Sequence, residues 1–389
     1  MTMLMTSEHA HVDLGSDFRD LVTSHVPWQE ENRRLHPEVV DALTDAGVFR
    51  MRTPRAFGGY ESPVRDLLEV ASTLGAIDGA TAWTAAVYWI PTWMTSMLPE
   101  EGQAEVFTHP DVRVCGTLSP GGVAKAVSGG FEISGGWSFI SGAMHADWQL
   151  LVVVDQDGPA GPMPLIALAR MSELQIVDDW HTSGLRGSGS VSTRCEQLFI
   201  PAERTAPLPA VLHGNGPWKA SAIYNVPLLP VASACSVGSV VGMARGALAD
   251  FEQRIDNRGI TYTGYSSQFE APLTHLQLAQ AHQRMDEAAY HADRLVDTVD
   301  NKAAERATWT VAERVHARAL MGSAVRRAKE VIELTSNASG GRSIYLTQAA
   351  QRFWRDVNAV SLHALMHPDT NAELYGRVLA GLDPDTLYV

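Results

Sequence analysis

The second half of the chain constrains the fold most strongly, because it is dominated by long runs with helical spacing. Four such runs follow one another, near residues 231–256, 272–300, 304–337 and 346–366. In the third run, apolar residues recur three and four positions apart and face arginine-rich positions, as expected for an amphipathic helix. This stripe consists of Val311, Val315, Ala319, Met321, Ala324 and Val325. Four long helices in succession predict a C-terminal four-helix bundle.

The middle of the chain has a different texture. Between Asp111 and about Pro209, short β-rich runs such as 149–154 and 198–200 alternate with turn segments such as 128–130. Many short strands separated by turn residues predict a small antiparallel barrel or sandwich, and we expect the β-barrel.

Helical patterns return in the first part of the chain, where Pro37 begins a run with an acidic first turn. A proline at this place favours the start of a helix. The sequence therefore predicts an α+β protein that is mostly α, in three parts. They are an N-terminal helical domain at 1–110, with 1–16 disordered, a central β domain at 111–212, and a helical bundle at 213–389.

Charge and composition exclude several classes of partner. The formal net charge of -14 argues against binding to nucleic acid or to an anionic membrane. The first residues lack the basic and apolar regions of a signal peptide. No apolar run approaches the roughly 18–20 residues that span a bilayer. We therefore expect a cytoplasmic protein that binds neither nucleic acid nor membrane.

An aromatic segment at residues 135–148, GGWSFISGAMHADW, is the most unusual feature of the β-rich part. It combines two indoles, a phenyl ring and a histidine on a predicted strand that ends in a glycine turn. One interpretation is a tightly packed sheet corner. The other is a platform for a flat heteroaromatic ligand, since Ser141 and the more distant Thr117 offer hydroxyls to its polar edges. The residues alone leave both interpretations open.

A glycine-rich segment at 184–190, GLRGSGS, is only superficially similar to a phosphate-binding loop. It lacks the Lys-Ser/Thr of a P-loop, and Ser192 stands where a dinucleotide motif needs its third glycine. The remaining functional interpretation is a flexible loop in which Arg186 binds an anion.

A histidine pair is the best candidate for a metal site, and it is weak. His363 and His367 stand four residues apart on a predicted helix, but Ala364 occupies the place of the glutamate in a zinc-binding helix. Pro368 places His367 at the end of that helix. We predict no metal, so His363 is either a buried structural histidine or a residue with another function.

Several segments, in a consistent order over nearly the whole chain, resemble the acyl-CoA dehydrogenase fold. Within that fold the pattern is most similar to the oxygenase components of two-component flavin-dependent monooxygenases (group D). This group includes hydroxyphenylacetate hydroxylases, dibenzothiophene monooxygenases and nitrososynthases. The resemblance rests on residues 33–38, 43–48, 54–59, 79–83, 119–124, 137–142, 145–148 and 184–190, and on Arg355 and Asp356 followed by His363.

The resemblance implies a flavin site. Reduced FMN or FAD would react with O2 to give a C4a-(hydro)peroxyflavin, which hydroxylates a small aromatic, heteroaromatic or amine substrate. By the family pattern, Ser141 faces flavin N5 and His363 lies beside the substrate as a base, an acid or a positioning group. The other flavin-binding residues implied in this way are Trp83, Thr117, Ser119, Phe139 and Arg186, together with Ser339, Gly340 and Gly341, which would reach the flavin of a neighbouring subunit.

The family also implies partners, namely a separate NAD(P)H:flavin reductase and three further copies of the chain in a homotetramer. The bundle has no Arg-x-x-Phe-Gly segment, which in acyl-CoA dehydrogenases holds the adenine end of FAD. This favours FMN and leaves FAD open. Residues 90–93, IPTW, lack the second histidine of many phenol-hydroxylating relatives. Hydroxylation at an amine, a sulfur or an activated ring carbon therefore stays open as well.

Two alternative functions share the fold. An acyl-CoA dehydrogenase removes a proton with a carboxylate, which the family pattern places about nine residues after Arg355, where this chain has Ala364. The other known location is empty too, since residues 221–249 contain no Asp or Glu. A related flavin oxidoreductase would therefore need an atypical base. The second alternative is a non-catalytic member that acts as a binding protein.

Overall fold

The computed structural model describes residues 12–158, 161–214 and 221–389. Of the segment predicted to be disordered, residues 1–11 lie outside this part of the chain. The N-terminal helices are α1 (Phe18–Asn32), α2 (Pro37–Asp45), α3 (Val64–Gly75), α4 (Gly79–Thr95) and α5 (Glu100–Val106). The helix predicted at Pro37 is confirmed. The His36 side chain accepts a backbone hydrogen bond at its start, and Gly47, with a φ of 78°, turns the chain after its end.

The middle part forms an open sheet. Its strands are β1 (Val114–Gly116), β2 (Gly122–Val127), β3 (Gly130–Ile140), β4 (Trp148–Asp155), β5 (Met163–Arg170), β6 (Gln175–Val177), β7 (Val191–Pro201) and β8 (Thr205–Pro207). The order is β6-β7-β3-β2-β4-β5-β8, with β1 beside β4. Among the described residues, no pairing joins β6 to β8 at the two ends of this path. The prediction of a closed barrel was therefore wrong. The edge strands β6 and β8 have three residues each and offer few hydrogen bonds for closure.

The sheet is also mixed rather than purely antiparallel. β4 pairs in parallel with both β1 and β2, and the other pairs are antiparallel. The reason lies in β3, which runs back along β2 and then turns at residues 141–147, so that β4 begins in the direction of β2. The short helix α6 (Leu208–Leu212) follows the last strand.

The C-terminal part contains five helices among the described residues. They are α7 (Leu228–Glu252), α8 (Pro272–Ala304), α9 (Val311–Ala338), α10 (Ala349–Val360) and α11 (Pro368–Leu379). The four predicted runs correspond to α7, α8, α9 and α10, but the fourth helix ends six residues earlier than predicted. α9 packs against α7, α8, α10 and α11, so the helices do not form a simple bundle of four.

Short 3-10 segments connect these elements. They are η1 (Val48–Arg52), η2 (Arg55–Phe57), η3 (Ala143–His145), η4 (Met171–Glu173), η5 (Arg186–Ser188), η6 (Ala202–Arg204), η7 (Ala222–Tyr224), η8 (Ile255–Asn257), η9 (Gln268–Glu270) and η10 (Gly340–Ile344). The predicted boundaries near residues 110 and 212 fall in the connections after α5 and after α6.

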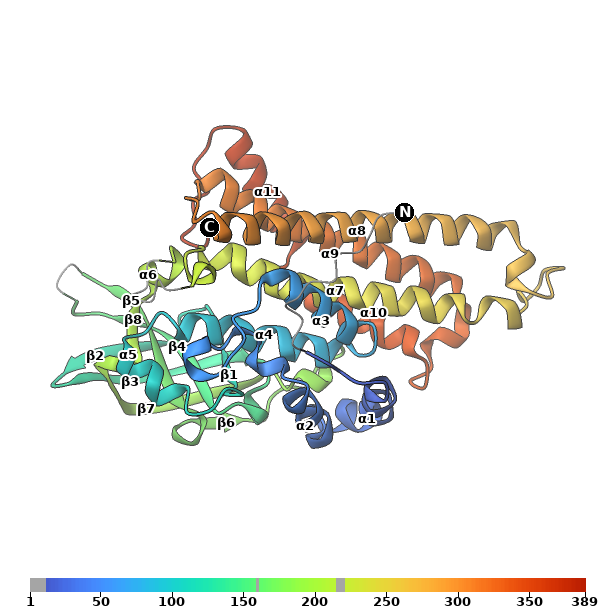
Figure 1. Cartoon of the computed structure of the whole chain (residues 1–389). Helices are drawn as coiled ribbons and strands as arrows, with labels where there is room; N and C mark the ends of the chain where they lie inside the picture. Colours follow the sequence, from blue (N-terminus) through green and yellow to red (C-terminus); the bar gives the residue numbers. More distant parts are fainter. Residues whose placement is uncertain (1–11, 159–160, 215–220) are drawn as a thin grey trace.

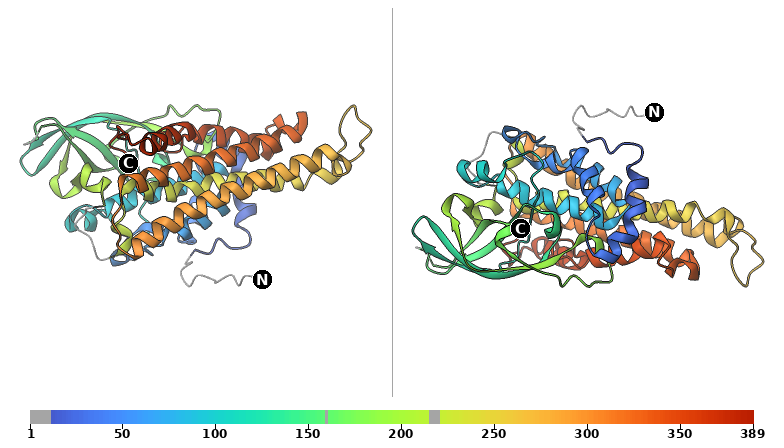
Figure 2. Two further views of the ribbon diagram at one scale, coloured as in Figure 1. Left: turned by 90° about the horizontal axis from the view of Figure 1, so that it is seen from above. Right: turned by 90° about the horizontal axis from the view of Figure 1, so that it is seen from below.

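The molecule is elongated, with the sheet at one end and the long helices extending away from it (Figures 1 and 2). α3 and α4 pack on α7, so that one hydrophobic cluster includes side chains from all three parts of the chain. Contrary to our expectation, α7 is long and apolar enough to cross a membrane. However, 94% of its most apolar window is buried inside the protein, as in the core helix of many folds.

Candidate active site

The aromatic segment 135–148 divides into a packed half and an open half. Trp137 and Trp148 are buried, and the Trp137 indole donates to the Val152 carbonyl at 3.0 Å. Phe139 differs, because 68% of its surface is exposed and its φ is +62°. The pairing of β3 with β7 is irregular between Trp137 and Ile140. Such bulges turn side chains out of the sheet, often beside functional sites.

A cavity of about 450 Å³ opens beside Phe139. Its walls come from α4, from the segments after β1 and at the end of β3, from α7, α9 and α11, and from residues 363–365 and 384–388. The predicted site residues that line it are Trp83, Thr117, Ser119, Phe139, Ser141 and His363. The fold thus brings together residues from four separate stretches of the sequence.

Ser141 is buried at the wall of the cavity and belongs to a row of hydroxyls. The indole Nε1 of Trp83 donates to Ser141 Oγ at 3.1 Å. Ser141 Oγ and Ser190 Oγ are 2.7 Å apart, and Ser190 Oγ is 2.7 Å from Ser188 Oγ. If Ser188 donates to Ser190 and Ser190 donates to Ser141, then Ser141 accepts twice and its own proton is free. The row therefore supports Ser141 as a hydrogen-bond donor to a ligand.

His363 lies across the cavity wall from this row, in the turn after α10. Its ring packs edge-on against Trp83, with centroids 5.1 Å apart. His363 is exposed on the cavity wall, but protein surrounds its ring on the other sides, and this desolvation lowers the pKa of His363 to about 4. Nδ1 accepts the Leu365 N–H at 3.3 Å. A neutral imidazole that accepts at Nδ1 carries its proton on Nε2, so His363 is a hydrogen-bond donor in this state.

Two predicted parts of the site lie outside this cavity. Arg186, in η5, does not line it, and its buried Nε has no hydrogen-bond partner among the described residues. Ser339, Gly340 and Gly341 follow the end of α9, about 30 Å along the helix from the cavity residue Arg318 at the usual rise per residue. Within one chain these glycines cannot share the cavity with Ser141.

Sequence reasoning missed several residues that line the cavity. They are Arg318 on α9, Glu373 on α11, and Asp385 and Tyr388 in the segment after α11. The apolar stripe of α9 was predicted to face an arginine-rich surface, yet Arg318 is buried. The signal that could have revealed Arg318 is its spacing, which places a charged residue on the buried face of α9.

The position of Ala364 bears on the alternative functions. Ala364 lines the cavity, so the place that the resemblance assigns to a dehydrogenase base carries only a methyl group. The two carboxylates on the cavity wall, Glu373 and Asp385, are both exposed residues.

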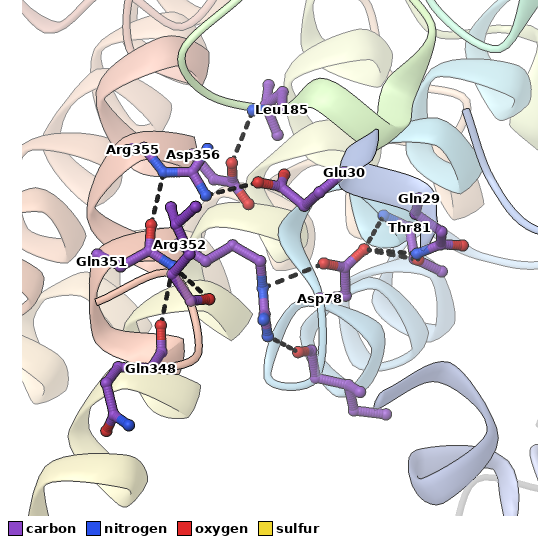
Figure 3. Close-up of polar contacts among 12 residues, drawn as sticks. Gln29, Glu30, Asp78, Thr81, Leu185, Gln348, Gln351, Arg352, Arg355 and Asp356 are labelled. Carbon is purple, nitrogen blue, oxygen red and sulfur yellow. Dashed lines mark hydrogen bonds and ion pairs between the residues drawn. The ribbon is translucent and has the colours of Figure 1, made fainter. Parts of the chain in front are cut away.

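A polar network joins elements that carry or adjoin the site residues, although none of the labelled residues lines the cavity (Figure 3). Asp78 caps α4 by accepting the Thr81 N–H at 2.9 Å, and it pairs with Arg352 of α10 at 3.4 Å. Asp356, one turn further along α10, accepts the Leu185 N–H at 2.6 Å. The network therefore links α4, which carries Trp83, to α10 and to the loop that leads into the serine row.

The neighbouring Arg355 extends these links to α1. Its Nη2 donates to Glu30 at 2.6 Å and its Nη1 donates to the Ser183 carbonyl at 2.5 Å. Burial, followed by the nearby charge of Asp78, raises the pKa of Asp356 to about 7. Asp356 Oδ2 has no hydrogen-bond partner among the described residues, which is consistent with a protonated carboxyl below that pH.

The histidine pair considered for a metal is not on one helix. α10 ends at Val360, and His367 is the N-cap of α11, where its Nδ1 accepts the Thr370 N–H at 3.3 Å. The expectation that His367 ends a helix was therefore wrong, because Pro368 begins the next helix. A different group, His25, His36 and Glu38, has potential metal-ligand atoms within 4.8 Å of one another. It lies near α1 and α2, and none of the three lines the cavity.

Comparisons with known proteins agree with this geometry. Residues 234–368 match the acyl-CoA dehydrogenase C-terminal domain. The chain is 31% identical over 382 residues to the oxygenase component of an FADH2-dependent resorcinol hydroxylase from Rhizobium sp., covering 95% of this chain and 93% of that protein. It is 28% identical to an indole-3-acetate monooxygenase from Pseudomonas putida, covering 91% of this chain and 90% of that protein.

Solved structures show the same architecture. XiaF from Streptomyces sp., determined in complex with FADH2 and glycerol, superimposes with a TM-score of 0.90 at 25% identity, covering 95% of this chain and 94% of that one. The class of protein is thereby defined: the fold is acyl-CoA dehydrogenase-like. The chain belongs to the oxygenase components of two-component flavin-dependent monooxygenases.

Proposed function

We propose that the protein uses reduced FMN or FAD and O2 to hydroxylate a small organic substrate, an aromatic, heteroaromatic or amine compound. The observation that carries this proposal is the single cavity that joins Trp83, Phe139, Ser141 and His363 and has Ala364 in place of a base. The named activities of the resorcinol hydroxylase and the indole-3-acetate monooxygenase support an aromatic substrate.

The residues at the sheet side of the cavity fit a flavin. Phe139 presents an exposed ring that a flat heteroaromatic can cover. Thr117 and Ser119 offer hydroxyls, and Ser141 offers its proton when Ser188 and Ser190 donate along the row. A bound reduced flavin would supply two electrons and activate O2, so that one oxygen atom enters the substrate and the other leaves as water.

His363 then acts on the substrate. Because it is neutral above its lowered pKa and carries its proton on Nε2, we assign it hydrogen-bond donation to a polar atom of the substrate. It thereby orients the ring that is oxidised. Trp83 keeps the imidazole edge-on and, through its donation to Ser141, couples the two sides of the cavity.

The protein would work with a separate NAD(P)H:flavin reductase, since the relatives are named as oxygenase components. Because such a reductase depends on NAD(P)H, we infer a cytoplasmic location. The test is incubation with resorcinol or indole-3-acetate, NADH, an independent flavin reductase, FMN or FAD, and ¹⁸O2. We expect a product that carries one ¹⁸O. If the label enters only hydrogen peroxide across a panel of phenols, indoles and amines, the proposal is wrong.

We further propose a homotetramer in which residues 339–341 approach the flavin of a neighbouring copy. The connections from α7 to α8 and from α9 to α10 lie at the end of the long helices that is far from the sheet (Figure 1). Exposed large apolar side chains occur in η9, at the start of α8, and in and after η10: Phe269, Leu273, Leu276, Ile344, Tyr345 and Leu346. Such surfaces usually mark interfaces. Leu346→Asp should shift the mass measured by light scattering towards smaller species. Leu379→Asp, at an exposed leucine of α11, is the matched control, and equal masses for both variants would contradict the interface.

A further inference from the structure

Arg318 is the one arginine among the described residues that lines the cavity. It projects from the buried side of α9 and is only 6% exposed. Its Nε donates to Asn371 Oδ1 at 3.0 Å, and its Nη1 donates to the Tyr388 carbonyl at 2.5 Å. These two bonds, to α11 and to the segment after it, hold the guanidinium in a fixed orientation.

The third nitrogen of this guanidinium is open. Nη2 has no hydrogen-bond partner among the described residues, and it is not among the fully enclosed polar atoms. Since the rest of the side chain is buried, its access is through the cavity. An arginine nitrogen that faces a cavity without a partner is a donor available to a ligand.

No carboxylate neutralises Arg318 within the described parts of the chain. Two arginines of α9 that are not buried form ion pairs, Arg326 with Asp369 and Arg327 with Glu287, both at 2.6 Å. The buried Arg314 and Arg318 form none among the described residues, and of these two only Arg318 lines the cavity. Burial lowers the pKa of Arg318 with no carboxylate opposing the shift. Burying a charge without a counter-ion costs free energy. The buried charge of Arg318 at the cavity wall therefore needs an explanation from function.

The two acidic residues on the cavity wall do not fill this role. Glu373 lies 3.9 Å from Arg377 on its own helix, and Asp385 forms no ion pair among the described residues. Both are exposed, whereas Arg318 is enclosed. The missing counter-ion is therefore expected to arrive with the ligand.

We propose that Arg318 determines substrate specificity by binding an anionic oxygen of the substrate, a carboxylate or an ionised phenol. This inference rests on the proposed function for the identity of the ligand as substrate. The anionic group lies at the side of the cavity formed by α9, α11 and residues 384–388. The ring that is oxidised extends from there towards His363, Trp83 and the sheet side with Phe139 and Ser141.

The test is a binding comparison between acids and their uncharged amides. The protein, reduced under nitrogen with bound flavin and again without flavin, is titrated with indole-3-acetate, 4-hydroxyphenylacetate and benzoate, and with the three corresponding amides. A charge-assisted hydrogen bond predicts that at least one acid binds about tenfold to a hundredfold more tightly than its amide. Resorcinol, compared below and above its first ionisation, distinguishes recognition of a phenolate from recognition of a carboxylate.

Variants assign the effect to Arg318. Arg318→Gln should remove the preference for the acid, and Arg318→Lys should keep part of it. Arg314→Gln is the matched control, because Arg314 lies one turn earlier on α9, is also buried, and donates to the Val389 carbonyl at 3.3 Å without lining the cavity. It should loosen the same segment after α11 yet retain the preference.

Three results would overturn the inference. They are acids that bind no more tightly than their amides in every pair while ionised resorcinol binds no more tightly than neutral resorcinol, a preference for the anion that survives Arg318→Gln, or a preference that both glutamine variants lose equally. Because binding is measured without turnover, the outcome is separate from the proposed function. A protein that prefers acids and hydroxylates none of them would refute the proposed function and leave this inference standing.

Discussion

The polar network of Figure 3 and the wall of the cavity both contain polar and charged side chains, but the two regions differ in whether these side chains have hydrogen-bond partners. In the network, Asp78, Arg355 and Glu30 have hydrogen-bonded or ion-paired partners on other elements. On the cavity wall, the buried Arg318 keeps one nitrogen open, Ser141 can direct its proton into the cavity when Ser190 donates to it, and the exposed His363 has Nε2 available. Burial with partners fixes elements in place, whereas burial with an open donor prepares a site for a ligand.

The two regions also depend on each other. Asp78 caps the helix that carries Trp83, and Asp356 holds the loop that leads to the serine row. Mutations in the network should therefore change stability first, and mutations in the cavity should change chemistry with little change in stability. Three predictions test this separation.

The largest expected effect is on turnover. His363→Ala should lower the rate of hydroxylation by about a hundredfold or more, because the substrate loses the donor that orients it. Product formed per NADH consumed, measured beside released hydrogen peroxide, checks this. The control is His109→Ala, at an exposed histidine that does not line the cavity. Equal product yields from wild type and His363→Ala would make His363 a structural residue.

The next effect is on stability and has a defined sign. The native pKa of Asp356 is raised to about 7, so the folded state keeps its proton at pH values where the unfolded state has lost it. This contribution is fully present below the unfolded pKa and is lost as the pH rises through about 7. Asp356→Asn keeps the acceptor for Leu185 and removes the titration. At pH 8 it should be more stable than wild type by on the order of 2 kcal/mol.

Urea unfolding at pH 5 and at pH 8 measures this difference. At pH 5 the difference should be smaller than at pH 8, because the folded wild-type carboxyl is neutral there while the unfolded one is ionised. The two proteins should become nearly equal only below a pH of about 4, where both carboxyls are protonated. Asp20→Asn, at an exposed residue of α1, serves as the control and should leave the pH dependence unchanged. A variant that is less stable than wild type at pH 8 would show that the charged form of Asp356 is the one the network needs.

The smallest effect is on the coupling of flavin oxidation to hydroxylation, measured as product formed per reduced flavin. Ser141→Ala removes one hydrogen-bond donor from the cavity and should lower product per reduced flavin about tenfold. Ser190→Ala should have a smaller effect, because Ser141 remains and loses only the hydroxyl beside it. Ser138→Ala is the control, since Ser138 bonds Ser192 and does not line the cavity. Equal product per reduced flavin in all three variants would show that the serine row does not contribute to the reaction.

Much of this protein could be predicted from local patterns. Helices such as α2 and α8 have their starting prolines and their periodicity within a few turns, and Phe139, Ser141 and His363 stand in short segments that resemble a family. Closure of the sheet could not be predicted, because it depends on whether strands far apart in the chain, β6 and β8, meet. The break between α10 and α11 was missed because the residues on both sides have helical spacing.

The amino-acid sequence by itself determined the element types, the flavin-type segments and the absence of a carboxylate at Ala364, since each is a property of neighbouring residues. Only the tertiary structure decided that six predicted residues share one cavity, that residues 339–341 lie far from it, and that Arg318 faces into it without a counter-ion. The physical reason is that burial and unpaired donors arise from contacts between distant segments. The aromatic segment 135–148 shows both levels: the bulge in β3 packs Trp137 into the sheet and turns Phe139 into the cavity.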